Sequence, residues 1–309
     1  MLRPHAGAIH WLQRSWGDRA GIKRGIHMSI KSSSIAIVTD STADIPVETA
    51  ESLNISVIPA VLTLDGETYV DGRDISRAEF YLRMPDLRTP PTTAVPSTIV
   101  FEETYQHLLE SGAERILSIH LSSKLSGMIN TAMQAARSFG DRVKVFDSSQ
   151  LSLGTGFQAI EAARVVKEGL DFDQVVSTAR QFRDKAYVVA LIDRLEFMRR
   201  SGRVNWLRAN IGDFLHIKQL VEVKGGLVNA LARTRTYTKA FERLISIAFT
   251  WSNIRRLAVL HSGAPEKAKE LTERVADLCP SPLMIVDVTT VIGVHVGPGC
   301  VGLAVLTQD

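Results

Sequence analysis

The sequence contains only two cysteines, Cys279 and Cys300, and they stand far apart in the chain. A disulfide-stapled extracellular domain needs more cysteines, and a zinc site needs further cysteine or histidine ligands at short spacing. We therefore expect no disulfide framework, no bound metal and no metal cofactor. The two thiols are expected to be reduced core residues of a cytoplasmic protein.

Long apolar runs are also missing. No stretch of about 20 consecutive apolar residues occurs, so no transmembrane helix is expected. Apolar residues nevertheless make up 45% of the 309 residues, which excludes a disordered chain and leaves enough material for two domains.

The body of the chain lacks an excess of positive charge. The net charge of +3 arises in residues 1–27, which carry five basic residues (Arg3, Arg14, Arg19, Lys23, Arg24) against Asp18 alone. A nearly neutral body argues against nucleic-acid binding. We expect residues 1–33 to be a basic tail, either flexible or the result of a mis-chosen start before Met28. A transit peptide or a membrane-surface segment would have a similar composition. We expect at most a transient contact of this tail with a membrane.

Three catalytic signatures are absent: the G-x-S-x-G elbow, the G-x-x-x-x-G-K-[ST] phosphate loop and H-E-x-x-H. No nucleophile–base pair is recognisable from the sequence either. The one dinucleotide-like pattern, Gly154-Thr155-Gly156-Phe157-Gln158-Ala159, is separated by seven residues from the preceding predicted strand and lies outside the first βα unit. A nucleotide cofactor is therefore not expected.

From Ser34 onward, short apolar runs alternate with amphipathic helical stretches. Strands are predicted at Ile35–Thr39, Ile55–Leu64, Arg115–Leu121 and Val143–Phe146, with helices between and after them. This spacing is typical of βαβ units and a parallel sheet. After Gly169, hairpins such as the one at Gly225-Gly226 mix with helices. We predict an α/β protein with an N-terminal parallel-sheet βαβ domain at residues 34–168 and a second α+β domain at residues 169–309.

Hydroxyl side chains gather where several predicted strands end. They occur in Asp40-Ser41-Thr42, in Ser122–Gly127, in Asp147-Ser148-Ser149 and in the loop that carries Thr92, Thr93 and Ser97. Ligands of open parallel sheets bind at the carboxyl ends of the strands, and hydroxyls and amides suit an anionic oxygen. Each of these residues could instead cap a helix, as Asp44 could cap the helix at Ile45–Leu53. The four loops together favour a pocket.

The second half supplies arginines and one of its histidines, His295, as candidate site residues. Arg199, Arg200 and Arg203 end a short helix and Arg233 follows a strand, so they are either solvated charges or contacts to an acidic partner or a phosphate. His295 lies in a glycine-rich apolar run before the last strand. A lone histidine of this kind is usually a satisfied core residue, but the flanking glycines permit close approach of a ligand, such as a buried carboxylate.

Across Ile35–Leu306 the chain resembles the DegV family, the fatty-acid-binding proteins that act as the lipid-presenting subunit of a bacterial fatty acid kinase. The resemblance rests on several short segments in matching order: Ile37–Thr42, Thr92-Thr93 through Pro96-Ser97, Leu121–Gly127, Asp147-Ser148, Leu195–Val204, Lys218 and His295–Gly302.

The resemblance implies a ligand tunnel between the two domains that holds a long-chain fatty acid of about C14–C18. It assigns the carboxylate to Thr93, Ser123, Ser126 and His295. Asp40, Ser41 and Thr92 would shape the pocket mouth, and Arg203 and Arg233 would contact a partner or phosphate. The partner would be a separate ATP-dependent kinase subunit, so this chain would not be an enzyme on its own.

Two departures from the family pattern stand out. Ala94 and Val95 replace the usual Ser-Gln pair of the Thr-Thr-Ser-Gln-Pro-Ser loop, and Gln219 replaces a proline after Lys218. The first removes two polar groups from the expected pocket mouth. Two other functions remain open: an autonomous phosphotransferase or hydrolase that uses the hydroxyl-rich crevice, and a membrane-surface adaptor that uses the basic tail.

Overall fold

The computed structural model describes residues 34–203, 217–279 and 283–308. The predicted basic tail, residues 1–33, lies outside the described residues, as does the beginning of the apolar stretch Phe214–Val223. Within the described part, the chain from Ser34 onward belongs to one compact unit.

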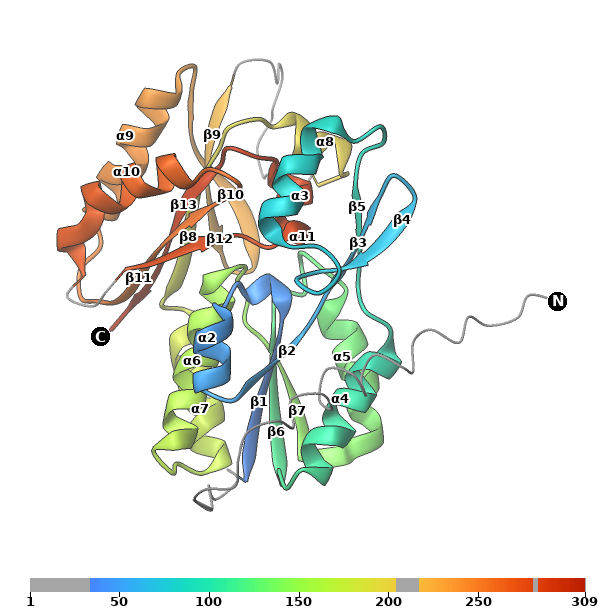
Figure 1. The fold of residues 1–309 in the computed structure, drawn as a ribbon. Coiled ribbons are helices and arrows are strands. Elements are labelled where there is room, and N and C mark those ends of the chain that lie inside the picture. The colour runs from blue at the N-terminus through green and yellow to red at the C-terminus, as the bar shows by residue number, and fades with distance from the viewer. Residues whose placement is uncertain (1–33, 204–216, 280–282, 309) are drawn as a thin grey trace, which may run out of the picture. The chain divides into compact units, whose positions relative to one another are not determined.

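A four-stranded parallel sheet forms the first half, as predicted. Its order is β2 (Ile55–Ile58), β1 (Ile35–Asp40), β6 (Arg115–His120) and β7 (Val143–Asp147). The strands are short apolar runs because helices cover both faces. Figure 1 shows α4 (Thr98–Glu110) and α5 (Met128–Ala136) on one face, and α2 (Val47–Ser52), α6 (Leu153–Lys167) and α7 (Phe172–Arg183) on the other.

The second half is built on a six-stranded mixed sheet, in which only β11 and β12 pair in parallel. Its order is β10 (Leu227–Thr234), β9 (Lys218–Lys224), β8 (Ala186–Ile192), β13 (Val301–Thr307), β11 (Ile254–His261) and β12 (Met284–Asp287). The helices α9 (Tyr237–Ala248) and α10 (Pro265–Val275) cover one face (Figure 1). The other face packs against α6. The predicted α/β fold, with a parallel sheet in the first half and a separate α+β second half, is confirmed. The domain boundary at residues 168 and 169 stays a prediction.

A third, small antiparallel sheet was not predicted. It consists of β4 (Glu67–Val70), β3 (Val61–Leu64) and β5 (Thr92–Ala94) in that order, and the helix α3 (Arg77–Arg83) follows β4 in the chain. The single strand predicted at Ile55–Leu64 is wrong, because the chain leaves the parallel sheet at Ile58 and enters the small sheet at Val61. Pro59 has no N–H for a sheet ladder, which suits it to the break between the two.

The glycine-rich segment before the last strand is helical, and no prediction was made for it from the sequence. The helix α11 (Thr290–Val296) ends at Gly297, whose φ is 72°, and a short helix α8 (Glu196–Arg200) packs against it. Asp44 is not the N-cap of α2; it ends the short 3-10 helix Ser41–Ala43 instead. Pro46 precedes the first residue of α2, and Asp44 adopts a left-handed conformation that directs its carboxylate elsewhere.

The helix α6 lies between the two large sheets and is buried from Leu153 to Ala163. The dinucleotide-like glycines lie inside this helix and serve packing, because a Cβ on Gly156 would stand 2.5 Å from the carbonyl oxygen of Ala43. This close approach explains the glycine and leaves no loop to hold a phosphate.

One charged side chain in this buried helix links the two halves. The carboxylate of Glu161 is 1% exposed and accepts hydrogen bonds from Arg255 at 2.6 Å and from Arg256 at 2.5 Å. We expect Glu161→Gln to lower the free energy of unfolding by about 2 kcal/mol, because two guanidinium groups lose a charged acceptor. Urea denaturation measures this loss; an unchanged midpoint would contradict the expectation.

Candidate lipid-binding site

An apolar cavity lies between the parallel sheet and the mixed sheet. Its volume is about 180 Å³. Its walls are mostly aliphatic: Leu121, Leu125, Met128, Leu151, Val188, Ala190, Ile192, Val221, Val223, Val228, Leu260, Val288, Val291, Ile292 and Val296. A cavity of this composition favours a hydrocarbon chain over a polar solute.

Most hydroxyls in the wall are already committed to other protein groups. Thr42 donates its hydroxyl to Asp40, Ser152 donates to Asp44 at 2.6 Å, and Ser262 donates to the carbonyl of Gly297 at 2.6 Å. These groups therefore add little polarity to the cavity, and its apolar character extends along most of the wall.

Besides His261 on β11, which pairs with Asp287 at 3.2 Å, four polar groups of the wall come from separate segments. Thr93 lies on β5, Ser126 in the loop between β6 and α5, and His295 near the end of α11, and Arg203 lines the same cavity. The Thr93 hydroxyl oxygen and Nε2 of His295 are 3.3 Å apart. The Ser126 hydroxyl oxygen accepts the amide N–H of Met128 at 3.2 Å, which leaves its O–H available to donate.

Burial lowers the pKa of His295 to about 4, and the neighbouring positive charge of Arg203 acts in the same direction. The imidazole is therefore neutral at physiological pH and offers one N–H donor. Thr93 and His295, with the guanidinium of Arg203 near His295, offer donors suited to a carboxylate oxygen, and the Ser126 hydroxyl lines the same cavity.

The structure does not bring every predicted residue to this cavity. Ser123 is exposed, and its amide donates to Asp147 at 3.2 Å, so in the Ser122–Gly127 loop it is Ser126 that lines the cavity. Thr92 and Arg233 are also exposed and do not line it. Ser41 accepts the amide N–H of Ala60 at 3.1 Å behind the wall.

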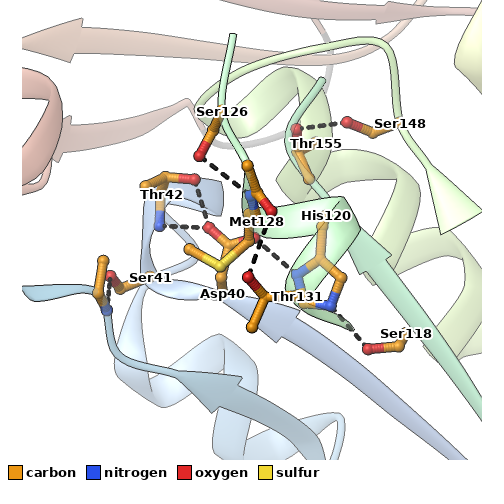
Figure 2. Close-up of polar contacts among 12 residues, drawn as sticks. Asp40, Ser41, Thr42, Ser118, His120, Ser126, Met128, Thr131, Ser148 and Thr155 are labelled. Atoms are coloured by element: carbon orange, nitrogen blue, oxygen red, sulfur yellow. Dashed lines mark hydrogen bonds and ion pairs between the residues drawn. The ribbon is translucent and has the colours of Figure 1, made fainter. Parts of the chain in front are cut away.

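Asp40 lies beneath the cavity wall in a buried hydrogen-bond network that sequence reasoning missed (Figure 2). Its carboxylate is 2.7 Å from Nδ1 of His120, and Nε2 of His120 is 2.7 Å from the hydroxyl oxygen of Ser118. The Tyr105 hydroxyl continues the chain to Ser118 at 2.8 Å. The register of β1 and β6 pairs Val38 with Ser118, and two residues further along it sets Asp40 beside His120. Knowledge of that pairing would have revealed the contact.

The order serine, histidine, aspartate corrects the expectation that no nucleophile–base pair exists. The arrangement has the contacts of a hydrolytic triad, but Ser118 and His120 are fully buried and neither lines the cavity. Ser118 thus opens onto neither the cavity nor the surface, and its hydrogen bonds link β1, β6 and α4.

The two residues that depart from the family pattern in the Thr92–Ser97 loop lie at the cavity. Ala94 and Val95 line the cavity, and Val95 lies close to Gly127 at the start of α5. The cavity wall is therefore apolar right beside Thr93.

Two kinds of feature are absent from the described part of the chain. Residues 34–203, 217–279 and 283–308 include no helix long and apolar enough to cross a membrane. The same residues hold no group of three or more histidine, cysteine and acidic side chains that could bind a metal ion.

Comparison with known proteins agrees with this geometry. The family model described as "Uncharacterised protein, DegV family" matches residues 34–308. A DegV domain-containing protein of Streptomyces coelicolor, SCO2569, is 35% identical over 278 residues, covering 89% of this chain and 99% of its own.

Solved structures show the same fold. A DegV family protein from Thermus thermophilus, described as binding fatty acid, superposes with a TM-score of 0.80 at 30% identity, covering 89% of this chain and 99% of its own. DegV from Bacillus subtilis, described as a fatty acid binding protein, gives 0.78 at 28% identity with the same coverage. The chain therefore belongs to the DegV family.

Proposed function

We propose that this protein binds a long-chain fatty acid, of about C14–C18, in the apolar cavity and presents its carboxylate to a separate ATP-dependent kinase subunit. The observation that carries the proposal is the division of the cavity into a long aliphatic wall and one polar group around Thr93 and His295, 3.3 Å apart. Fatty-acid binding by the Thermus thermophilus and Bacillus subtilis relatives supports it.

The tail supplies the affinity and the head group fixes the position. Burying about fifteen methylenes at ~0.8 kcal/mol each gives roughly 12 kcal/mol before the cost of ordering the chain. The carboxylate then accepts hydrogen bonds from Thr93, Ser126 and His295, with Arg203 close by. The family resemblance also assigns Ser123 to the carboxylate. Because Ser123 is exposed, it is left out of the proposed contacts.

In the proposed reaction a carboxylate oxygen attacks the γ-phosphorus of ATP bound by the kinase subunit. ADP leaves, and an acyl-phosphate, a mixed anhydride, is formed. This chain supplies position rather than catalysis, and the use of ATP places the pair in the cytoplasm. Arg203, at the cavity, and Arg233, exposed on β10, are the candidates for contact with the partner or the transferred phosphate.

Mass spectrometry of a denaturing solvent extract tests the proposal. The protein purified from a bacterial host is expected to release about one C14–C18 fatty acid per chain, and the delipidated protein to take up added palmitate. A folded protein that releases no lipid and takes none up would overturn the proposal.

A further inference from the structure

The helix α11 carries His295, yet segments from the first half of the chain hold its start. Thr289 donates its amide N–H to Asp44 at 2.7 Å, and the hydroxyls of Thr289 and Thr290 both donate to the carboxylate of Asp71, the latter at 2.7 Å. These four residues are buried, with at most 5% exposed. The two aspartates lie near one end of the sequence and the two threonines near the other, so their contacts fix the helix to a distant part of the fold.

The helix α3 holds the same segment from another side. Tyr81 donates its hydroxyl to the carbonyl of Val288 at 3.0 Å, and Arg77 donates to the carbonyl of Asp287. A Cβ on Gly293 would stand 2.6 Å from the Tyr81 hydroxyl and 2.7 Å from the Phe80 ring. Only glycine permits this close approach of α11 to α3.

The small sheet connects these anchors to the other half of the head-group site. In β3, Leu62 pairs with Thr93 of β5 on one side and with Tyr69 of β4 on the other. Asp71 follows β4 directly, and its amide donates to the carbonyl of Ala60 at 3.0 Å, just before β3. Thr93 and Asp71 are thus held by the same three strands.

These contacts form a closed frame. It runs from Thr93 across the small sheet to Asp71, from Asp71 to Thr289 and Thr290, and along α11 to His295, which returns to Thr93 at 3.3 Å. We infer that Asp71, through its hydrogen bonds to Thr289 and Thr290, is the positioning residue that sets the separation of Thr93 and His295. This inference rests on the proposed function, because it concerns the geometry offered to the carboxylate.

The inference predicts an effect on head-group recognition that differs from a general loss of stability. Thr290→Val removes one donor to Asp71 at almost constant shape. It is expected to weaken palmitate binding about tenfold and to leave binding of palmitic acid methyl ester unchanged. Thr290→Ser keeps the hydroxyl and is expected to restore palmitate binding.

A matched control is available in Thr155→Val. Thr155 is fully buried on α6, bonds to the Ser148 hydroxyl at 2.8 Å and does not line the cavity. Its loss is expected to lower the melting temperature while leaving the ratio of the two ligand affinities unchanged. Should valine at position 290 prevent folding, Asp71→Asn tests the same bonds, because an amide offers one acceptor oxygen in place of two.

The outcomes separate the inference from the function on which it rests. If His295→Ala lowers palmitate affinity selectively while Thr290→Val and Asp71→Asn change both ligands equally, or neither, the inference is wrong and the proposed function stands. If His295→Ala also fails to distinguish acid from ester, the carboxylate does not lie at Thr93 and His295, and both this placement of the head group and the inference that rests on it are wrong. Whether a fatty acid binds at all is decided separately by the solvent extract.

Discussion

Replacing His295 with alanine is expected to weaken binding of palmitate by about 10- to 100-fold, the range for loss of a hydrogen bond to a charged group. The neutral imidazole is 7% exposed and is one of the few donors in an otherwise aliphatic wall. Loss of the N–H leaves the buried carboxylate with fewer partners, and no water replaces it at equal strength in an apolar cavity. The methyl ester carries no charge, so its affinity is expected to fall much less.

Titration of delipidated protein with both ligands by calorimetry measures this difference. His295→Gln retains an N–H donor and is expected to lie between the wild type and the alanine variant. His107→Ala, at a surface position on α4 that does not line the cavity, is the control and is expected to bind both ligands normally. Equal losses for acid and ester in His295→Ala would show that the carboxylate does not lie at Thr93 and His295.

The parallel sheet was predictable because its strands are encoded locally. Each of the four strands is a short apolar run bounded by turn residues, and the helices between them are long enough to cross over the sheet. The mixed sheet was predictable in outline for the same reason. The small sheet was not, because β5 is very short, lies in a proline- and threonine-rich loop and pairs with β3, from which β4 and α3 separate it in the chain.

The helix α11 could not be predicted from local preference. Its sequence, Thr290–Val296, consists mostly of β-branched residues around a central glycine, and both favour a strand or a loop over a helix. The structure makes it helical through distant contacts, from Asp44 and Asp71 to its start and from α3 to Gly293. Tertiary contacts outweigh propensity here.

The polar lining of the cavity was predictable by residue type and less so by orientation. Thr93, Ser126 and His295 line the cavity, but which serine of the Ser122–Gly127 loop faces inward depends on the turn of that loop. Their role toward a carboxylate stays a prediction. Asp44 and Asp71 were missed as site-supporting residues because their partners lie near the opposite end of the sequence.

Two buried ionisable groups, His295 and Asp44, should oppose each other as the pH falls. Burial lowers the pKa of His295 to about 4. As the pH falls, the unfolded chain therefore protonates this histidine before the folded chain does, and folding stability is lost between pH 6.5 and pH 4. Burial raises the pKa of Asp44 to about 6 against the favourable charge of Arg77. As the pH falls, the folded chain therefore protonates Asp44 before the unfolded chain does, and folding stability is gained between pH 6 and pH 4. Each effect amounts to about 3 kcal/mol.

Single variants should expose the two opposing slopes. Relative to delipidated wild type, Asp44→Asn is expected to lose about 3 kcal/mol of unfolding free energy between pH 6 and pH 4, because His295 then titrates without compensation. His295→Gln is expected to gain about 3 kcal/mol over pH 6.5 to 4, and the double variant to follow the wild-type slope.

Urea denaturation at half-unit pH steps measures all four proteins. The groups that face Asp44 are Arg77, Asp71, Ser152 and Thr289, and the group that faces His295 is Arg203. All five residues are kept in every variant. Parallel curves for the four proteins would show that neither residue titrates in this range.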